Sequence, residues 1–228
     1  MIMKKWDKLP DVMKTDEVKP YYLALKRKTA SLIIKRVFDI IVSLILLILL
    51  SPVFLVISIM IKTDSKGPVM FRQVRVTQYG KTFRIFKFRT MVTDAEKLGT
   101  QVTVDNDSRI TKTGNRLRKC RLDEIPQLLN ILKGEMSFVG TRPEVEKYVN
   151  CYTPEMMATL LLPAGVTSTA SIAYKDEDRL LKDAVSPDDV YVKQILPEKM
   201  KYNLEYLKNF GFFYDIRVMI RTVTAVAE

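Results

Sequence analysis

The stretch IIVSLILLILLSPVFLVISIMI, residues 40–61, is a run of 22 residues without a charged side chain. A straight helix of this length would extend about 33 Å, close to the hydrocarbon thickness of a bilayer. Ser51-Pro52 interrupts the run, and proline kinks or breaks a helix because it lacks a backbone N–H and clashes with the preceding turn. The halves are each too short to cross a bilayer alone. The sequence therefore predicts a membrane element that is broken at Ser51-Pro52.

Basic residues flank this run on both sides. Ten Lys or Arg occur within residues 1–36, and five follow the run: Lys62, Lys66, Arg72, Arg75 and Lys81. The positive-inside rule therefore selects no orientation. These features alone favour a re-entrant hairpin and a kinked span about equally.

The composition restricts the chemistry. The 228 residues include 37 Lys and Arg against 26 Asp and Glu, a formal net charge of +11 that favours anionic partners such as nucleic acid, phosphorylated molecules or anionic membranes. The absence of His excludes Ser-His-Asp and Cys-His catalysis and imidazole zinc sites. Cys120 and Cys151 are too few for a disulfide scaffold and are expected to be free thiols. Catalysis must therefore use carboxylates, Lys, Tyr, Ser or Cys, alone or with a metal.

The spacing of apolar residues, together with Gly and Pro residues that end helices and strands, predicts regular elements after the apolar run. Three are expected: a β-hairpin over 68–90 with its turn at 78–80, a helix over 115–132 interrupted before Leu122 and ended by Gly134, and a helix over 144–162 ended by Pro163.

The segment from Arg109 to Glu144 concentrates functional residue types. Basic residues precede the adjacent acids Asp123 and Glu124, and Arg142 follows them. One interpretation is structural: Asp123 caps a helix, Glu124 suits its first turn, and the cations are solvated. The other is chemical, because a helix N-terminus with arginines binds phosphate, and adjacent carboxylates can hold Mg²⁺ or attack phosphorus. Without His, a carboxylate is the natural nucleophile for phosphoryl transfer here.

Several ordered motifs resemble those of the small monotopic phosphoglycosyl transferases, a family of bacterial sugar transferases. The resemblance runs from about residue 35 to 175 and resumes weakly over 190–225. The motifs are Lys35-Arg36-Val37-Phe38-Asp39, the apolar run with Ser51-Pro52, Lys87-Phe88-Arg89-Thr90-Met91, Asp107-Ser108-Arg109-Ile110-Thr111, Leu122-Asp123-Glu124-Ile125-Pro126-Gln127, Leu132-Lys133-Gly134-Glu135-Met136-Ser137-Phe138-Val139-Gly140 and Arg142-Pro143-Glu144.

The resemblance implies an enzyme at the cytoplasmic face of the bacterial inner membrane. Such an enzyme moves a sugar-1-phosphate from a UDP-sugar to polyprenol (undecaprenyl) phosphate and releases UMP, the first membrane step of surface glycoconjugate biosynthesis. In this family the Asp of the Asp-Glu pair is the nucleophile, so Asp123 would form a covalent phospho-sugar intermediate. Glu124 would assist with Mg²⁺, for which both acids are the expected ligands, or as a base.

The resemblance also implies which residues bind substrate phosphate: Arg118, Arg142, Lys87, Arg89 and Lys175. The implied partners are the UDP-sugar, polyprenol phosphate and membrane lipid, without nucleic acid, while association of several copies stays open. The alternative from another class is a membrane-tethered basic module that binds nucleic acid or anionic lipid without catalysis, which the net charge supports.

The chain departs from the family pattern in residues 164–175. Thr169 and Ser171 replace the usual Trp and Gln, and Lys175 replaces an Arg. Outside this stretch, Thr141 stands where Pro is usual. Because the acid pair is intact, the reaction is retained as the expectation, whereas the sugar and nucleotide contacts stay open.

The expected fold is mainly α with a small β element, in a monotopic membrane protein with a re-entrant helix-break-helix hairpin and amphipathic interfacial helices. The aromatic residues after Pro197 also suit an ordinary core, and the sequence does not separate the two roles. Four parts are expected: a basic interfacial arm over 1–34 with a helix near 21–32, the membrane hairpin over 35–62, the catalytic core over 63–175, and an inserted surface segment with C-terminal amphipathic membrane-associated helices over 176–228.

Overall fold

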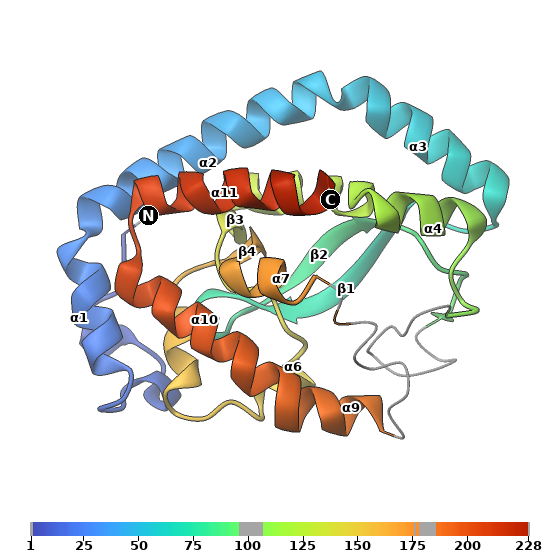
Figure 1. Cartoon of the computed structure of the whole chain (residues 1–228). Helices are drawn as coiled ribbons and strands as arrows, with labels where there is room; N and C mark the ends of the chain where they lie inside the picture. The colour runs from blue at the N-terminus through green and yellow to red at the C-terminus, as the bar shows by residue number, and fades with distance from the viewer. Residues whose placement is uncertain (1, 96–106, 176, 178–185, 228) are drawn as a thin grey trace.

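The computed structural model describes residues 2–95, 107–175, 177 and 186–227. These residues form a mainly helical protein with two small two-stranded sheets (Figure 1). The helices and strands are η1 Trp6–Lys8, η2 Asp11–Met13, α1 Lys19–Arg27, α2 Thr29–Leu49, α3 Ser51–Asp64, β1 Met70–Val76, η3 Gln78–Gly80, β2 Thr82–Phe88, α4 Lys112–Lys119, η5 Leu122–Gln127, α5 Leu128–Lys133, β3 Met136–Val139, α6 Glu146–Val149, η6 Met156–Leu161, β4 Ala164–Thr167, α7 Thr169–Ala173, α9 Pro187–Val190, the π-helical turn η7 Tyr191–Ile195, α10 Leu196–Asn209 and α11 Phe212–Ala227.

The apolar run forms α3 and much of α2, and the two helices meet at an angle of 61°. The break falls at Leu50, with Pro52 in the first turn of α3, and the Ser51 hydroxyl donates to the Ile48 carbonyl oxygen at 2.8 Å. In the described part of the chain no single helix is long and apolar enough to cross a bilayer, whereas the bent pair meets both criteria. The predicted break at Ser51-Pro52 is confirmed.

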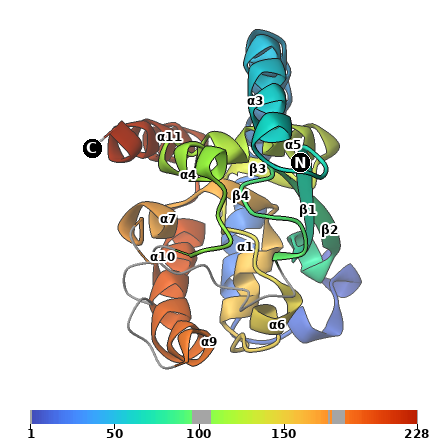
Figure 2. The ribbon, with the colours of Figure 1, turned by 90° about the vertical axis from the view of Figure 1, so that its right-hand side faces the viewer.

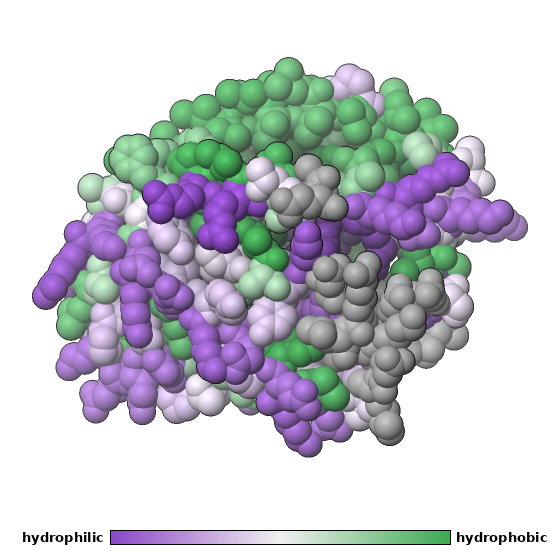
Figure 3. Space-filling model, viewed as in Figure 1, coloured by the Kyte–Doolittle hydropathy of each residue, from purple (hydrophilic) through white to green (hydrophobic). Residues whose placement is uncertain are grey.

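The bent pair forms an arch along one side of the molecule, and its outer surface is apolar (Figures 1 and 3). Turning the molecule shows α3 projecting away from the remaining elements (Figure 2). Large apolar side chains remain exposed along the arch: Ile40, Ile41, Leu44, Ile45, Ile48, Leu49, Leu55, Val56 and Ile59. A contiguous apolar surface of this kind marks an interaction site for a partner that replaces water.

A buried polar joint fixes α2 to the rest of the protein. The Lys35 ammonium donates to Asp215 of α11 at 2.5 Å and to the Val139 carbonyl oxygen at the end of β3 at 2.8 Å. The neighbouring Arg36 donates to the last carbonyl oxygens of α5, those of Ile131 and Leu132. Consecutive basic residues of α2 therefore hold three elements that surround the site described below.

The N-terminal segment differs from the expected interfacial arm. Many of its apolar residues, among them Met13, Tyr22 and Leu25, are buried in a hydrophobic core together with residues of η6 and α10. The helix expected near 21–32 is divided at Lys28, where α1 ends and α2 begins. Burial of the apolar residues makes this segment part of the globular body instead of a separate arm.

The predicted β-hairpin over 68–90 is confirmed. Strands β1 and β2 pair antiparallel from Met70 opposite Phe88 to Val76 opposite Thr82. Positive φ angles at Tyr79 and Gly80 close the turn. The side of β2 that contacts η5 carries Lys87, so the hairpin places this lysine beside the Asp123–Glu124 pair.

The second sheet is the parallel pair β3–β4, in which Met136 lies opposite Ala164. Just beyond β3, Gly140 packs directly on Gly165. A Cβ added to Gly165 would lie 2.1 Å from the Gly140 nitrogen. Only glycine permits this close approach of two backbones. The contact fixes the start of the loop that carries Arg142.

Two predictions for the C-terminal half are wrong. The helix expected over 144–162 is two short turns, α6 and η6, because residues 150–155 between them include Pro154, which cannot continue a helix. The segment expected as a surface insertion lies partly outside the described residues, but Tyr191 and Ile195 within it are buried. They pack against α10 because η7 continues directly into that helix.

The aromatic residues after Pro197 divide between the two roles left open by the sequence. Tyr206 and Phe210 are buried, so α10 is a core helix. By contrast, α11 lies beside the arch and exposes Phe213, Ile220 and Val223 (Figure 1). The interfacial role therefore fits α11 and not α10.

Candidate active site

The chain makes a sharp turn immediately before the acid pair. Helix α4 ends at Lys119, and Arg121 adopts a left-handed conformation with φ of 54°. The 3₁₀ helix η5 then begins, and its first turn contains Asp123 and Glu124. No side chain caps η5 in the described structure, so Asp123 is not the capping residue that the structural interpretation required. Both carboxyl groups instead line a cavity.

Glu124 is held by two cations from distant segments. Lys87 of β2 and Arg142 of the loop after β3 donate to its Oε1 atom at 2.8 Å and 2.7 Å. Burial opposes ionisation of Glu124, but the charges of Arg142 and Lys87 outweigh it and hold its pKa well below the usual range. Glu124 is therefore a fixed anion that orients both cations.

Asp123 has a contrasting environment. It is 8% exposed, and no hydrogen bond from the described residues reaches its carboxylate. Burial raises the pKa of Asp123, the nearby charge of Lys87 opposes this shift, and Glu124 adds to it. A desolvated carboxylate without hydrogen-bonded partners has its lone pairs available to attack an electrophile.

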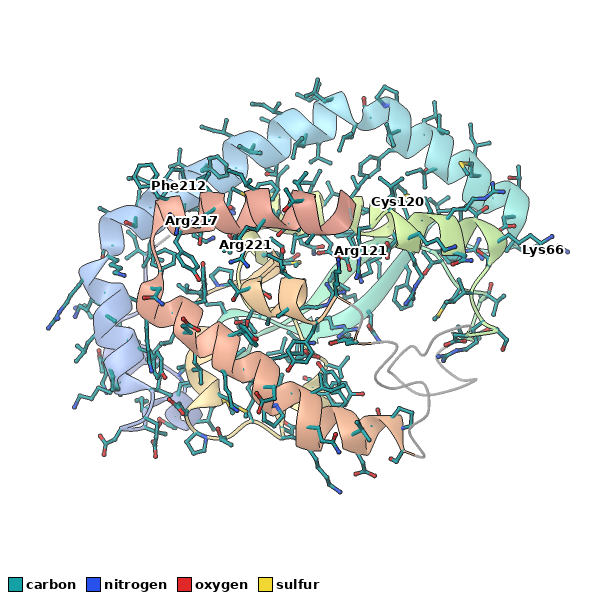
Figure 4. All side chains as sticks on the ribbon, viewed as in Figure 1. Lys66, Cys120, Arg121, Phe212, Arg217 and Arg221 are labelled. Carbon is teal, nitrogen blue, oxygen red and sulfur yellow. The ribbon has the colours of Figure 1, made fainter. Side chains whose placement is uncertain are left out.

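The cavity around the acid pair has a volume of about 1100 Å³. One wall, here called the cationic rim, consists of basic residues from α4, the turn after it and the end of α7: Lys112, Arg118, Lys119, Arg121 and Lys175. Arg121 lies where α4 ends, close to α11 (Figure 4), and it donates to the Lys175 carbonyl oxygen at 3.3 Å. Lys175 in turn donates to the carbonyl oxygen of Ala225 in α11 at 3.4 Å. The guanidinium and ammonium groups of this rim are of the kinds that bind phosphate in proteins.

A second wall of the cavity is apolar and adjoins the arch. It contains Leu46 and Leu50 of α2 with Ile125, Leu128, Phe138 and Val166. The cavity therefore extends from the acid pair to the end of the helix whose outer face is exposed and apolar.

The structure brings most of the predicted site residues together. Asp123, Glu124, Lys87, Arg118, Arg142 and Lys175 all line this cavity. Ser51 and Pro52 lie at the bend, next to the lining residue Leu50. Arg89 is separate: it is buried and donates to the carbonyl oxygens of Lys66 at 2.6 Å and Ser65 at 2.9 Å, just after α3.

Sequence reasoning named none of the residues at a third side of the cavity as site residues. They are Arg75, Glu144, Tyr148, Glu177, Tyr191 and Lys199. One signal was available, because Tyr191 and Lys199 are eight residues apart, which places them near one face of a helical segment. Nothing in the sequence indicated that this face meets Glu144, since the contact depends on how α10 packs.

Fold and site together define a protein with a cavity, lined by carboxylates and cations, beside an apolar bent helix pair. The profile of the family described as "Bacterial sugar transferase" matches residues 30–228. A protein of Aeromonas hydrophila, named UDP-N-acetylgalactosamine-undecaprenyl-phosphate N-acetylgalactosaminephosphotransferase, is 35% identical over 196 residues, which are 85% of this chain and 43% of that protein. The UDP-glucose:undecaprenyl-phosphate glucose-1-phosphate transferase of Escherichia coli K12 is 36% identical over 197 residues, 84% of this chain and 39% of that protein. The uncharacterized sugar transferase EpsL of Bacillus subtilis 168 is 33% identical over 195 residues, 86% of this chain and 88% of that protein.

The chain belongs to the bacterial sugar transferase family. It spans about two fifths of the length of the first two relatives and most of the third. The resemblance seen in the motifs is confirmed.

Proposed function

We propose that the protein transfers a sugar-1-phosphate from a UDP-sugar to undecaprenyl phosphate and releases UMP. The names of the two relatives that state an activity support this reaction class. The observation that carries the proposal for this chain is the Asp123 carboxylate, which faces a cavity with cationic walls and accepts no hydrogen bond from the described residues.

In the proposed reaction, an Asp123 oxygen attacks the β-phosphorus of the UDP-sugar. The bond from that phosphorus to the bridging oxygen breaks, and UMP leaves with the electron pair. The sugar phosphate is then held on Asp123 as an acyl phosphate. An oxygen of undecaprenyl phosphate attacks the same phosphorus, which forms the lipid diphosphate sugar and restores the Asp123 carboxylate.

Lys87 and Arg142 are the groups best placed to stabilise the transferred phosphate. Glu124 holds both cations, so no reorganisation is needed when negative charge develops on the phosphoryl oxygens. The cationic rim, which includes Arg118, suits the remaining phosphates, and the apolar wall suits the lipid chain of the acceptor.

Mg²⁺ is part of the proposal, and the donor set fits it. Asp123 has a carboxylate without described hydrogen bonds, and the Oε2 atom of Glu124 makes only a contact of 3.5 Å with Arg142. Mg²⁺ prefers such oxygen ligands and takes the rest of its shell from water and phosphate. When bound, the ion would neutralise diphosphate charge.

We propose that α2 and α3 insert into the cytoplasmic leaflet of the bacterial inner membrane as a re-entrant hairpin. The 61° bend and the concentration of exposed large apolar residues on the arch and α11 support this arrangement. The chain would then leave the bilayer on the side where it entered, and the cavity would open at the level of the lipid headgroups.

UMP release from a panel of UDP-sugars, with undecaprenyl phosphate and Mg²⁺ in vesicles, tests the reaction. We expect release with at least one donor, and a loss of at least about 10³-fold in the Asp123→Asn variant. The variant should melt at the wild-type temperature, because the lost carboxylate makes no described hydrogen bond. Turnover near the wild-type rate in this variant would exclude Asp123 as the nucleophile.

A further inference from the structure

The third side of the cavity differs chemically from the other two. We call it the polar end; it consists of Arg75, Glu144, Tyr148, Glu177, Tyr191 and Lys199. Glu144, Lys199 and Tyr191 are only 6%, 4% and 3% exposed, yet they line the cavity. Burying a polar side chain costs free energy unless it is hydrogen-bonded to the protein or to a ligand. This end mixes hydrogen-bond donors with acceptors, whereas the rim is cationic and the wall at α2 is apolar.

The polar end is held in place by its own contacts. The Tyr191 hydroxyl donates to Glu144 Oε1 at 2.6 Å, and the Lys199 ammonium donates to Glu177 Oε2 at 2.8 Å and to the Tyr191 hydroxyl at 3.2 Å. The Tyr191 ring packs on the Tyr148 ring with centroids 4.7 Å apart. Tyr191 also belongs to the π-helical turn η7, a distortion that frequently occurs at functional sites.

These contacts leave hydrogen-bonding capacity at the cavity surface. Among the described residues, nothing donates to Glu144 Oε2 or to Glu177 Oε1. Lys199 carries three protons and uses two of them in the bonds above. A ligand can therefore donate to two carboxylates and accept from one ammonium, which is the pattern that neighbouring hydroxyl groups satisfy.

The polar end lies close to the Asp123–Glu124 pair and its cations. Arg142, which binds Glu124, and Glu144, which binds Tyr191, are two residues apart in the segment that follows β3. Two residues of chain span at most about 7 Å, and both side chains line the cavity. A group joined directly to a phosphate at Arg142 would therefore meet Glu144 within the span of one hexose ring.

We propose that the polar end binds the sugar ring of the UDP-sugar through its hydroxyl groups, and that Tyr191 and Lys199 help to select the sugar. This inference rests on the proposed function. The three sides of the cavity then correspond to the three chemical parts of the reaction: the rim to phosphates, the wall at α2 to the lipid, and the polar end to the sugar.

Tyr191→Phe and Lys199→Met test the assignment. Tyr191→Phe keeps the ring contact with Tyr148 and removes only the hydroxyl. Tyr206→Phe is the matched control, since Tyr206 is also a buried tyrosine whose hydroxyl donates to a carboxylate, Asp215 at 2.8 Å, but it does not line the cavity.

The readout is kcat/KM for UMP release with UDP-glucose, UDP-galactose and their N-acetylamino counterparts. Both test variants should change the ratio of kcat/KM between the preferred donor and its epimer by about 10-fold or more, since discrimination by a polar site depends on paired hydroxyls. Inhibition by UDP, which lacks the sugar, should stay within about 2-fold of wild type. The control should change neither quantity.

Two results would overturn the inference. An equal loss of kcat/KM for all donors would indicate a structural role, and weakened inhibition by UDP in step with the donors would place the nucleotide at the polar end. If Lys199→Met melts well below the control, Glu177→Gln tests the same surface, because its side chain is 25% exposed. Failure of the proposed function itself is distinct: the wild-type protein would then release UMP from no donor.

Discussion

Asp123 and Glu124 are adjacent in the chain, yet their carboxyl groups have opposite electrostatic environments. Glu124 accepts hydrogen bonds from Lys87 and Arg142, and its pKa is lowered. Asp123 is buried without such partners, and its pKa is raised. Neighbouring acids with pKa values displaced in opposite directions are typical of sites that divide two roles between two similar groups. Glu124 is thereby suited to hold the cations, and Asp123 to attack phosphorus.

The raised pKa of Asp123 predicts how the rate depends on pH. Asp123 must be ionised to attack, so kcat/KM should fall as the pH decreases through its pKa, which lies above the ordinary value for Asp. Among the neighbouring charges, that of Lys87 lowers the pKa of Asp123 most. Lys87→Met removes this charge, so the acid limb of the pH profile should move to higher pH. The measurement is kcat/KM for UMP release against pH.

Lys112→Met provides the control for this experiment. Lys112 lines the same cavity, but it is not among the charges that displace the pKa of Asp123. This variant should leave the acid limb in place. A limb that moves to lower pH in Lys87→Met would contradict the assignment of Asp123 as the titrating group.

For Arg89 the sequence predicts a phosphate-binding role, whereas the structure indicates a structural one, and a substitution can distinguish the two. Its guanidinium donates to the carbonyl oxygens of Ser65 and Lys66 and does not line the cavity. Arg89→Met should lower the free energy of unfolding by about 3 kcal/mol, because two charge-assisted hydrogen bonds are lost. The KM for the UDP-sugar should stay within about 2-fold of wild type. Denaturant titration and steady-state kinetics measure the two quantities, and a raised KM with unchanged stability would restore the phosphate-binding role.

At the scale of elements, α4 carries Arg118 and is fixed by backbone contact. Gly114 of α4 packs against Thr90, just after β2. The backbone N–H of Thr113, also in α4, donates to Asp64 Oδ2 at the end of α3 at 2.9 Å. The strand that supplies Lys87 and the helix that supplies Arg118 are thus held together next to the end of α3.

Gly114→Ala should displace α4. An added Cβ would lie 2.0 Å from the Thr90 carbonyl oxygen, which is backbone and cannot rotate away. We expect a loss of about 2–3 kcal/mol in the free energy of unfolding, together with a loss of UMP release as Arg118 moves. Gly211→Ala is the control, because its Cβ would meet only the Asn209 carbonyl oxygen at 4.0 Å, and it should cost less than about 1 kcal/mol. Equal effects of the two substitutions would refute the packing argument.

At the scale of the whole molecule, the outer surface of the arch differs from the face seen below it. The arch is apolar, whereas many hydrophilic side chains lie on the face seen below it (Figure 3). The chain termini both lie below the arch (Figure 1). This separation matches a protein that inserts one edge into a bilayer and keeps its body in water.

The re-entrant arrangement predicts that residues before and after the hairpin are accessible from the same side. Cys151 is exposed, and Ile2→Cys would add an exposed thiol before α2 in a variant that lacks Cys120. A membrane-impermeant thiol reagent should label both positions in inside-out vesicles and neither in right-side-out vesicles. Labelling of the two thiols from opposite sides would establish a kinked span instead.

The sequence alone determined the local features of this protein. Proline and glycine fix the break at Ser51-Pro52 and the end of α5 at Gly134, because their restricted or permissive backbones act within a few residues. Alternation predicted the β-hairpin, and the ordered motifs predicted the family and most of the residues that share the cavity.

Only the tertiary structure decided the rest, since burial and partner choice depend on contacts between distant segments. The sequence placed the N-terminal segment at an interface, but packing buries Met13 and Leu25 in the core. Arg89 looks like a phosphate ligand beside Lys87, but the hairpin directs it to α3. The polar end was not foreseen, because Glu144 and Lys199 become neighbours only when α10 packs against the loop after β3. Local rules fix where an element begins and ends, whereas long-range packing fixes which side chains meet.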